Sequence, residues 1–447
     1  MFDAIVARLA AIRRAPGMAL DWTLVAVGCG LLAARKPAFF ADGIPRYDAV
    51  QALVQHHHVT SMKYPLIGPL FSAPLWLFGN AVGHAPGATA RFNLLVFLVG
   101  LVLIWRLLRT RVDRALLTHF ILLMVGASMF AAHVVTFYGE TFTAVLVGAG
   151  LMAAAAGVAR AGWTAAAIGA ANTPVSILGL AFAAAVQALR RKRLRYGLAV
   201  AAALALTVLD SELRLHTAFT HAYLHDRGFR TVMPFSGRPG FSYPIFFGLL
   251  SVFFSFGKGI VFFAPGLFLP ARARLRLAGE RLWHGYRLWL AFIAGLVLVY
   301  APWWAWYGGS FWGPRFFLFA SMPACLALAA RVRYPGSLAA RVVTAVALIL
   351  SIWVGISAYV FDQAAAPVCV ANDFALEHLC WYTPEFSVLW RPFVQAMSLS
   401  ALDVLYLTFA AIVAVRMLHA LFRGVRDDAD VIRLRALVPD YRTGWRL

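Results

Sequence analysis

Residues that could catalyse a group transfer gather first in the segment Ala41–Asp48. This segment places two carboxylates, Asp42 and Asp48, on either side of Arg46 and Tyr47. A partly desolvated carboxylate can take a proton from a hydroxyl, as general base catalysis requires. The same residues also suit a solvated loop, in which an Asp-Gly pair makes a turn ahead of a short helix. The segment therefore supplies two candidate bases and leaves both readings open.

Three isolated cations lie in motifs that are rich in glycine, proline or aromatic residues. Lys63 lies in the segment Ser61–Pro69, Lys258 stands between two glycines, and Arg315 ends a run of tryptophans and glycines. An ammonium or a planar guanidinium at a membrane surface can hold a phosphate. Lys63 also suits simple snorkelling, in which only its ammonium reaches water. We predict all three as phosphate ligands.

The candidates for holding a sugar or an acceptor are Glu140, Arg46, Tyr47, Tyr138 and three tryptophans. Glu140 follows Tyr138 at the start of an apolar run. Ionisable groups at membrane depth are costly and usually functional, although a helix N-terminus also favours a carboxylate. Trp304, Trp306 and Trp312 could stack on sugar rings, or they could form the aromatic belt that is common at membrane interfaces.

The residues predict no metal site. His56-His57-His58 are adjacent in sequence, and adjacent residues do not share a helix face. No other ligand spacing rises above chance. No cofactor is predicted with certainty, and a requirement for a divalent metal stays open.

The elements that position these residues are predicted to be membrane helices. The chain has 447 residues, of which 62% are hydrophobic and 13% charged. Soluble domains have roughly half apolar and a quarter charged residues, so a soluble fold is excluded. Runs such as Phe92–Leu108, Val342–Val360 and Leu399–Val415 are long enough to cross about 30 Å of hydrocarbon as helices. The expected fold is an all-α, polytopic helical bundle.

The basic residues predict the orientation of this bundle. The formal charge is +21, but the basic residues are spread between apolar runs instead of gathering on one soluble module. This distribution argues against nucleic acid as a partner. Reading each large cluster as cytoplasmic gives about twelve crossings, with both termini in the cytoplasm. The pair Arg35-Lys36 and the arginines of the loop Asp210–Pro244 are exceptions.

The same topology divides the chain into one membrane module, residues 1–447, with a basic cytoplasmic tail at 424–447. It predicts a long first external loop at residues 39–91 that carries the candidate bases. Leu66–Val82 within this loop is apolar but contains prolines. Counting it as a crossing would place the next basic cluster outside, so we predict an interfacial helix.

Two of the four cysteines, Cys369 and Cys380, share one predicted external loop. Oxidising conditions there would permit a disulfide, and two cysteines in one loop do not establish it. Cys29 and Cys325 fall within predicted crossings and suit packing.

The order of the motifs resembles a family of membrane enzymes. The motifs are Arg-Tyr at 46–47, Lys-Tyr-Pro at 63–65, Tyr-Gly-Glu at 138–140, Phe-Ser-Phe-Gly-Lys-Gly at 254–259 and Trp-Tyr-Gly-Gly-Ser at 306–310, with Gly-Pro-Arg-Phe following. This order resembles the type C membrane glycosyltransferases (GT-C) of the protein-mannosyltransferase and aminoarabinose-transferase kind. The resemblance extends from about Trp22 to Arg391.

The resemblance implies an inverting glycosyltransferase that uses a polyprenyl-phosphate sugar as donor. It implies a catalytic aspartate in the first external loop, with Asp42 preferred and Asp48 second. Lys63 resembles the family's lysine, and Arg315 resembles the arginine of its late external loop. The family's Asp-Glu pair before Arg-Tyr is missing, and so is its arginine at a turn like Asn172–Pro174.

The expected setting is the inner membrane of a bacterium, with the active site facing the periplasm or exterior. The acceptor could be a lipid, a glycan or a protein, and membrane lipids surround the chain. The alternative function is a polytopic transporter or a flippase for lipid-linked sugars. It would need ionisable residues through the bundle interior and often repeat symmetry, whereas the candidates here cluster on one side.

Overall fold

The computed structural model describes residues 2–37, 39–217, 226–361, 366–395 and 398–423, with side chains described from residue 17 onward. Within these ranges the named secondary-structure elements are all helices, and an isolated β-bridge joins Arg227 and Pro239. The predicted all-α class is therefore confirmed. The predicted basic tail, 424–447, lies outside the described residues.

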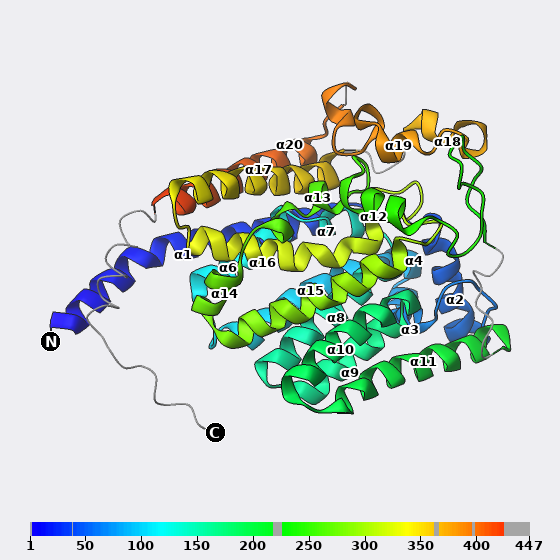
Figure 1. Ribbon diagram of the computed structural model, residues 1–447, viewed down its shortest axis with the longest axis horizontal. Helices are drawn as coiled ribbons and strands as arrows, with labels where there is room; N and C mark the ends of the chain where they lie inside the picture. The colour runs from blue at the N-terminus through cyan, green and yellow to red at the C-terminus, as the bar shows by residue number, and fades with distance from the viewer. Residues whose placement is uncertain (1, 38, 218–225, 362–365, 396–397, 424–447) are drawn as a thin grey trace.

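Long helices run side by side along the longest axis of the molecule (Figure 1). The α-helices of the first half are α1 (Phe2–Ala34), α2 (Gly43–His56), α3 (Ile67–Ala81), α4 (Ala85–Ala90), α5 (Phe92–Leu108), α6 (Arg114–Gly126), α7 (Phe130–His133), α8 (Gly139–Ala156), α9 (Ala159–Ala171), α10 (Ile177–Arg191) and α11 (Gly197–Leu215). Those of the second half are α12 (Ile245–Phe254), α13 (Ile260–Phe263), α14 (Arg272–Ala278), α15 (Glu280–Tyr300), α16 (Ser321–Arg333), α17 (Leu338–Val360), α18 (Pro367–Phe374), α19 (Leu379–Tyr382) and α20 (Ala401–Arg423). Short 3-10 turns η1 (Pro174–Ser176) and η4 (Arg315–Ala320) lead into α10 and α16.

The chain is a multi-pass membrane protein. Among the described residues, seven helices are long and apolar enough to cross a membrane: Gly17–Ala34, Ala85–Leu108, Gly139–Ala156, Glu280–Tyr300, Arg315–Arg333, Leu338–Val360 and Ala401–Arg423. The other predicted crossings fall on shorter or more polar helices, so the count of twelve stays a prediction.

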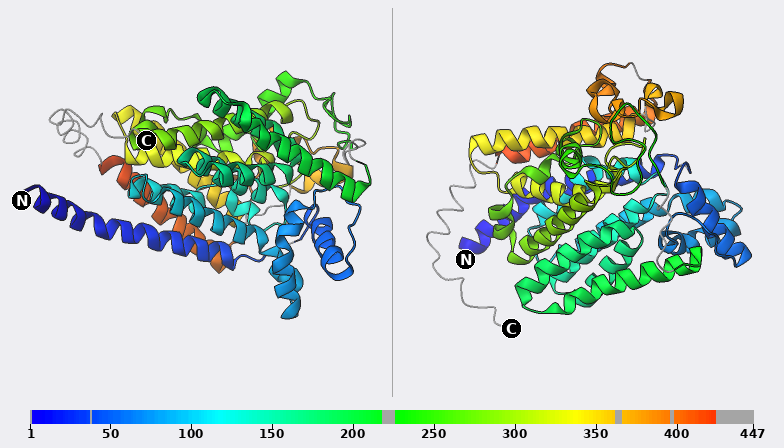
Figure 2. Two further views of the ribbon diagram at one scale, coloured as in Figure 1. Left: turned by 90° about the horizontal axis from the view of Figure 1, so that it is seen from below. Right: turned by 45° about the vertical axis from the view of Figure 1, so that its right-hand side comes forward.

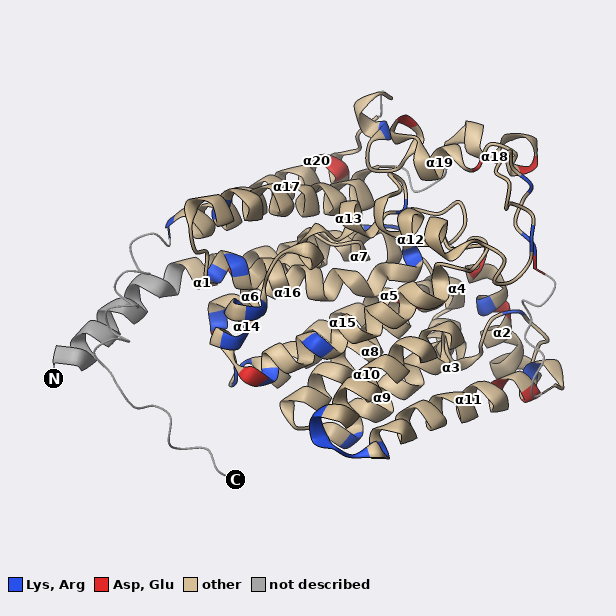
Figure 3. Ribbon diagram, viewed as in Figure 1, with Lys and Arg blue, Asp and Glu red and all other residues tan. Residues whose placement is uncertain are grey.

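The basic clusters share one end of the bundle. Figure 3 shows Lys and Arg gathered at its left-hand end, around α14 and at the turn between α10 and α11. The last turns of α10 and α16 supply Arg190, Arg191, Arg331 and Arg333. This common end is what the positive-inside pattern requires. That it faces the cytoplasm stays a prediction.

The centre of the bundle is built on α16 and α8. In the apolar stretch Arg315–Arg333, 94% of the residues are buried inside the structure. Asp113 joins the end of α16 to the start of α6. Its carboxylate caps α6 by accepting from the Leu116 backbone N (3.0 Å), and it pairs with Arg333 in the last turn of α16 (2.9 Å). A Cβ added to Gly150 of α8 would lie 2.5 Å from the Gly162 carbonyl of α9, so these two helices need glycine to pack this closely.

The segment predicted as the first external loop, residues 39–91, forms a small helical layer at one end of the bundle (Figure 2). Helix α3, which falls in the predicted interfacial segment, packs against α2 and α4. Its outward face exposes Leu70, Phe71, Leu77 and Phe78. Contact of this apolar surface with water is unfavourable in free energy, whereas a lipid interface would cover it.

Cys369 and Cys380 form a disulfide in the structure, with their Cα atoms 6.0 Å apart. It closes the segment Cys369–Cys380, which includes most of α18 and lies in a loop that the sequence predicts to be external. Glu377 within this closed loop accepts a hydrogen bond from the Ser310 hydroxyl (2.5 Å). The disulfide loop is therefore tied to the glycine-rich segment that precedes Arg315.

Candidate active site

A buried ion pair joins two segments that lie 273 residues apart in the sequence. The Arg315 guanidinium donates through Nη1 to Asp42 Oδ2 at 2.7 Å. The other Asp42 oxygen, Oδ1, accepts from the Tyr64 hydroxyl at 2.6 Å. The side chains of Arg315 and Asp42 are 9% and 18% exposed. Arg315 is the first residue of η4, which leads into the buried helix α16. This position places its guanidinium at one end of the central helix.

Glu140 faces the same guanidinium from another helix. Its Oε1 lies 3.6 Å from Arg315 Nε. Glu140 is in the first turn of α8, where the helix dipole also favours a negative charge. Arg315 thus lies against two carboxylates from different elements. We call the set of Asp42, Tyr64, Tyr138, Glu140 and Arg315 the Asp42–Arg315 cluster.

Aromatic rings enclose the guanidinium. The Arg315 Cζ lies 5.2 Å from the centroid of the Tyr138 ring and 4.6 Å from that of Phe311. Phe40 contacts both of these rings, at centroid distances of 5.4 and 5.9 Å. The Tyr138 hydroxyl is buried and has no hydrogen-bond partner within the described part of the chain. A buried hydroxyl without a partner costs free energy, so it is suited to receive a polar ligand group.

Arg46 brings a second guanidinium to the cluster. It is 7% exposed, and its Cζ lies 4.9 Å from the centroid of the Tyr64 ring. A Cβ added to Gly139 would lie 2.9 Å from Arg46 Nη2. A side chain at this glycine of the Tyr-Gly-Glu motif would have to displace the Arg46 guanidinium.

Asn172 joins the elements around the cluster. Its Oδ1 accepts from the Gly68 backbone N (2.8 Å), while its Nδ2 donates to the Gly139 carbonyl (2.9 Å) and to Thr143 Oγ1 (3.1 Å). One side chain thus links the starts of α3 and α8. This is the turn at which the family that the motifs resemble carries an arginine, and here a neutral amide fills the place.

Two side chains of α11 bind the backbone of the segment between α2 and α3. Asp210 accepts from the Leu66 backbone N (2.8 Å), and Arg214, which pairs with Asp210 at 2.7 Å, donates to the Met62 carbonyl. Both charged side chains are buried. These contacts fix the segment that presents Lys63 and Tyr64.

Lys63 lies at the edge of the cluster. Its ammonium pairs with Asp226 and lies 5.9 Å from the centroid of the Tyr64 ring. Its side chain is 37% exposed, so the ammonium lies near the surface. The structure therefore places Lys63 next to a member of the cluster, on its open side.

The environment of Asp42 lowers its pKa. Burial alone would raise the pKa of this carboxyl. The charge of Arg315, the hydrogen bonds from Tyr64 and Arg315, and the charge of Arg46 outweigh burial and hold the pKa below its ordinary value of 3.8. Asp42 is therefore ionised at neutral pH, and each of its oxygens can accept a further hydrogen bond.

Lys258 has a different environment from the one that the sequence predicted. Its ammonium donates to the carbonyls of Gly309 (2.9 Å), Phe311 (2.5 Å) and Gly313 (3.0 Å). An ammonium has three N–H donors, and these three carbonyls use all of them. The predicted contact with a phosphate therefore has no donor left. Lys258 instead holds the glycine-rich loop that ends at Arg315.

Replacing Lys258 by Met is expected to lower the stability of the protein by about 2 kcal/mol, because it leaves buried carbonyls without a donor. The measurement is the thermal unfolding midpoint in detergent, with Lys258→Arg as the matched variant that keeps the charge. An unchanged midpoint in Lys258→Met, together with weaker binding of a polyprenyl phosphate, would instead support the phosphate contact.

Several other predicted site residues lie away from the cluster. Trp306 is buried against Trp381 (5.6 Å between ring centroids), and the Trp312 indole N–H donates to Ser357 Oγ at 3.3 Å. Trp304 packs on Tyr307. Among the described contacts, none joins these three tryptophans to the Asp42–Arg315 cluster, so their stacking on a sugar stays a prediction.

Tyr47 and Asp48 also point elsewhere. The Tyr47 ring packs on Phe39 at 4.7 Å between centroids, in an apolar layer under α2. Asp48 is exposed on α2, and no described hydrogen bond or ion pair joins it to Arg315. Of the two candidate bases, only Asp42 lies in the cluster.

A small cavity adjoins the ion pair. It holds about 20 Å³, enough for about one water molecule. Glu140, Arg315, Thr143, Thr173 and Ser176 supply its polar lining. Within the described residues no group of three or more His, Cys, Asp or Glu side chains could hold a metal ion.

Sequence reasoning missed Tyr64, Asn172 and the Asp210–Arg214 pair. Tyr64 was visible within the Lys-Tyr-Pro motif, and the pair has the i,i+4 spacing of helical neighbours. Asn172 gave no signal of its own, because a turn-forming Asn before Thr-Pro is common on protein surfaces.

Two solved structures are similar to this chain. Both are of ArnT from Cupriavidus metallidurans, one bound to undecaprenyl phosphate and one in the apo state. The identities are 14% and 15%, the TM-score is 0.48 for each, and each match covers 97% of this chain and 82% of ArnT. No protein-family profile matches the chain, and the search of curated proteins finds no match.

Proposed function

We propose that the protein is a membrane glycosyltransferase that transfers a sugar from a polyprenyl-phosphate donor to an acceptor hydroxyl, with inversion. The observation that carries this proposal is the buried guanidinium of Arg315, which lies against Asp42 and Glu140 under aromatic rings. A planar guanidinium suits a phosphate, a carboxylate beside it suits a base, and aromatic faces suit a sugar.

In this mechanism Asp42 takes the proton of the acceptor hydroxyl. The acceptor oxygen attacks the anomeric carbon, the bond from that carbon to the phosphate oxygen breaks, and its electron pair leaves on the polyprenyl phosphate. Arg315 stabilises the negative charge that develops on this phosphate, as preorganised donors do in a water-excluded site. Lys63, at the open side of the cluster, neutralises the phosphate at the membrane surface.

The remaining polar groups orient the reactants. Tyr138 offers a buried hydroxyl without a partner, and Glu140 accepts hydrogen bonds from sugar or acceptor hydroxyls. Arg46 adds positive charge beside Asp42. The acceptor is a lipid, a glycan or a protein that carries a free hydroxyl.

The whole chain acts as one membrane module in a bacterial inner membrane, with the cluster on the extracytoplasmic side. The gathering of the basic clusters at the opposite end of the bundle supports this orientation (Figure 3).

Proteoliposomes test the proposal against transport. Purified protein is given polyprenyl-phosphate sugars and membrane extract, and two quantities are measured: new glycosidic product and movement of donor across the bilayer. The proposal expects product without donor movement. Donor movement without any new glycosidic bond would establish the transporter instead.

Tyr64→Phe tests the environment of the base. It removes a hydrogen bond that lowers the pKa of Asp42, so that pKa rises. The base must be ionised, so the rate falls when the pH drops through this pKa. We expect the acid limb of the pH–rate profile to move to higher pH in the variant, while activity at neutral pH persists. An unmoved limb would show that another group is the base.

A further inference from the structure

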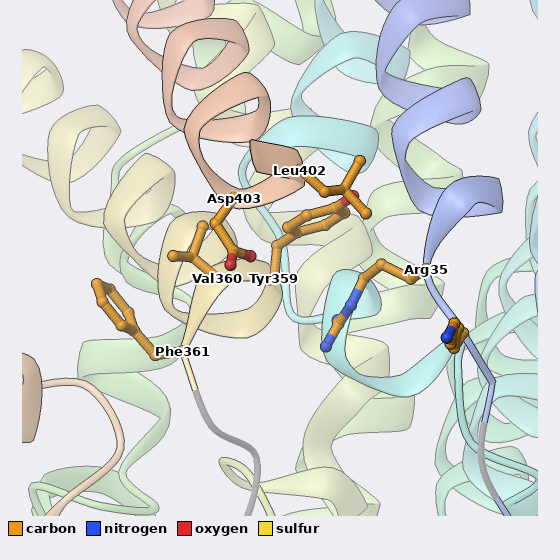
Figure 4. A pocket seen from close by; sticks show the side chains of 7 residues that line it. Arg35, Tyr359, Val360, Phe361, Leu402 and Asp403 are labelled. Atoms are coloured by element: carbon orange, nitrogen blue, oxygen red, sulfur yellow. The ribbon is translucent and has the colours of Figure 1, made fainter. Parts of the chain in front are cut away.

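A second cavity lies at the ends of three helices that flank the lipid-facing surface. It holds about 310 Å³, within the range of small-molecule sites. The end of α1, the end of α17 and the start of α20 form its walls (Figure 4). Its lining residues are Arg35, Lys36, Tyr359, Val360, Phe361, Leu402 and Asp403. None of them belongs to the Asp42–Arg315 cluster.

Opposite charges line this cavity without pairing with each other. The Arg35 guanidinium donates through Nη1 to the carbonyls of Ala131 and Ala358, both at 3.0 Å, and lies 5.0 Å from the centroid of the Tyr359 ring. Figure 4 shows this ring between Arg35 and Asp403. Within the described residues, no ion pair within 4.0 Å joins the two charges. The cavity therefore separates a cationic wall from an anionic one.

Structural roles account for part of this arrangement. Asp403 Oδ2 caps α20 by accepting from the Ser400 backbone N (2.8 Å) and hydroxyl (2.6 Å). Arg35 ties α1 to two neighbouring segments through its carbonyl contacts. These bonds use one nitrogen of Arg35 and one oxygen of Asp403. They do not explain Lys36, which adds a second cation at the end of the bundle opposite the basic clusters.

The surroundings indicate where the occupant comes from. Val404 and Leu405, next to Asp403, are 50% and 58% exposed. Farther along the same helix, Ile412 and Val415 are also exposed. This continuous apolar face on a helix long enough to span a membrane is suited to acyl chains. The cavity thus opens where a lipid headgroup would lie.

We propose that this cavity binds the headgroup of a zwitterionic phospholipid of the phosphoethanolamine class. Arg35 and Lys36 hold its phosphate, while Asp403 and the Tyr359 ring face its ammonium. The acyl chains extend over Val404 and Leu405. An anionic headgroup would meet Asp403 as a like charge, so a polyprenyl phosphate or a phosphatidylglycerol fits this wall less well.

Native mass spectrometry of the full-length protein tests the proposal. The protein is incubated with equal amounts of phosphatidylethanolamine and phosphatidylglycerol, and the retained lipids are counted. We expect wild type to retain the ethanolamine lipid preferentially. Asp403→Asn, which keeps an acceptor for Ser400, is expected to lower the ratio of the two lipids about two- to fivefold, the effect of a partly exposed ion pair.

Lys36→Gln is the complementary variant, because it weakens the phosphate contact that both lipids share. It is expected to lower retention of both lipids without changing their ratio. Arg276→Gln, on the basic end of the bundle, is the matched control and should leave the ratio at its wild-type value. Thermal unfolding midpoints verify that all variants are folded.

Three results would overturn the proposal. The first is an unchanged lipid ratio in folded Asp403→Asn. The second is full retention of both lipids in Lys36→Gln. The third is equal retention of the two lipids by the wild-type protein, because the proposal requires the ethanolamine headgroup to be preferred. None of these readouts depends on glycosyl transfer, so the inference stands or falls separately from the proposed enzyme activity.

Discussion

Replacing Asp42 by Asn is expected to lower the rate of glycosyl transfer by about 10²- to 10⁴-fold, the usual contribution of a general base. Asn keeps the size of the side chain, and its one carbonyl oxygen can still accept from Arg315 while its NH₂ group faces the Tyr64 hydroxyl, but it cannot take a proton. The measurement is turnover of a polyprenyl-phosphate sugar under single-turnover conditions. Donor binding should change little.

Asp48→Asn is the matched control for this prediction, because Asp48 is a second carboxylate of the same segment and is exposed on α2. Its activity should equal that of wild type. Loss of activity in Asp48→Asn with an active Asp42→Asn would assign the base to Asp48. Full activity in both variants would remove the mechanism.

Replacing Arg315 by Gln is expected to lower transfer by about 10²- to 10³-fold, the loss seen when a preorganised donor to a developing charge is removed. Arg315→Lys should recover part of this activity, since an ammonium keeps the charge but not the planar fork. Turnover and polyprenyl phosphate binding are measured together. Both should fall in Arg315→Gln.

Stability is a confounding factor for Arg315, because the variant leaves Asp42 and Glu140 without their shared cation. Breaking one side of a buried pair costs about 3–5 kcal/mol. The double variant Arg315→Gln with Asp42→Asn removes one positive and one negative charge, so it should regain thermal stability and stay inactive. A stable and active double variant would contradict the assigned roles of both residues.

The sequence predicted the class of fold because that class depends on composition and on the length of apolar runs. It also predicted that the basic clusters share one end, and Figure 3 bears this out. The disulfide between Cys369 and Cys380 was permitted without being determined. Loop position alone cannot fix how close two sulfur atoms come, because that depends on how the loop folds between them.

The sequence identified many candidate residues but not their partners. Asp42, Glu140 and Arg315 were selected by residue type, and the structure brings them together from three distant segments. Lys258 was selected by the same reasoning and proved to hold a backbone loop. A lone cation between glycines is compatible with both roles, and only the position of the carbonyls distinguishes them.

The tryptophans illustrate the same limit. Trp304, Trp306 and Trp312 closely precede Arg315 in the sequence, yet no described contact joins them to the cluster, whereas the Phe311 ring lies against the guanidinium. Glycines 308, 309 and 313 in this loop all have positive φ. Such turns reverse the direction of neighbouring side chains, so proximity in sequence did not predict proximity in space.

The most direct test of the account is the fate of a polyprenyl-phosphate sugar that is ¹³C-labelled at its anomeric carbon. Wild-type protein in nanodiscs is incubated with this donor and membrane extract, and NMR follows the labelled carbon. The proposed mechanism gives a new glycosidic bond of inverted anomeric configuration with equimolar release of polyprenyl phosphate, and neither is expected in Asp42→Asn. A product that keeps the donor's configuration, or folded protein that binds the donor and never breaks its anomeric bond, would contradict it.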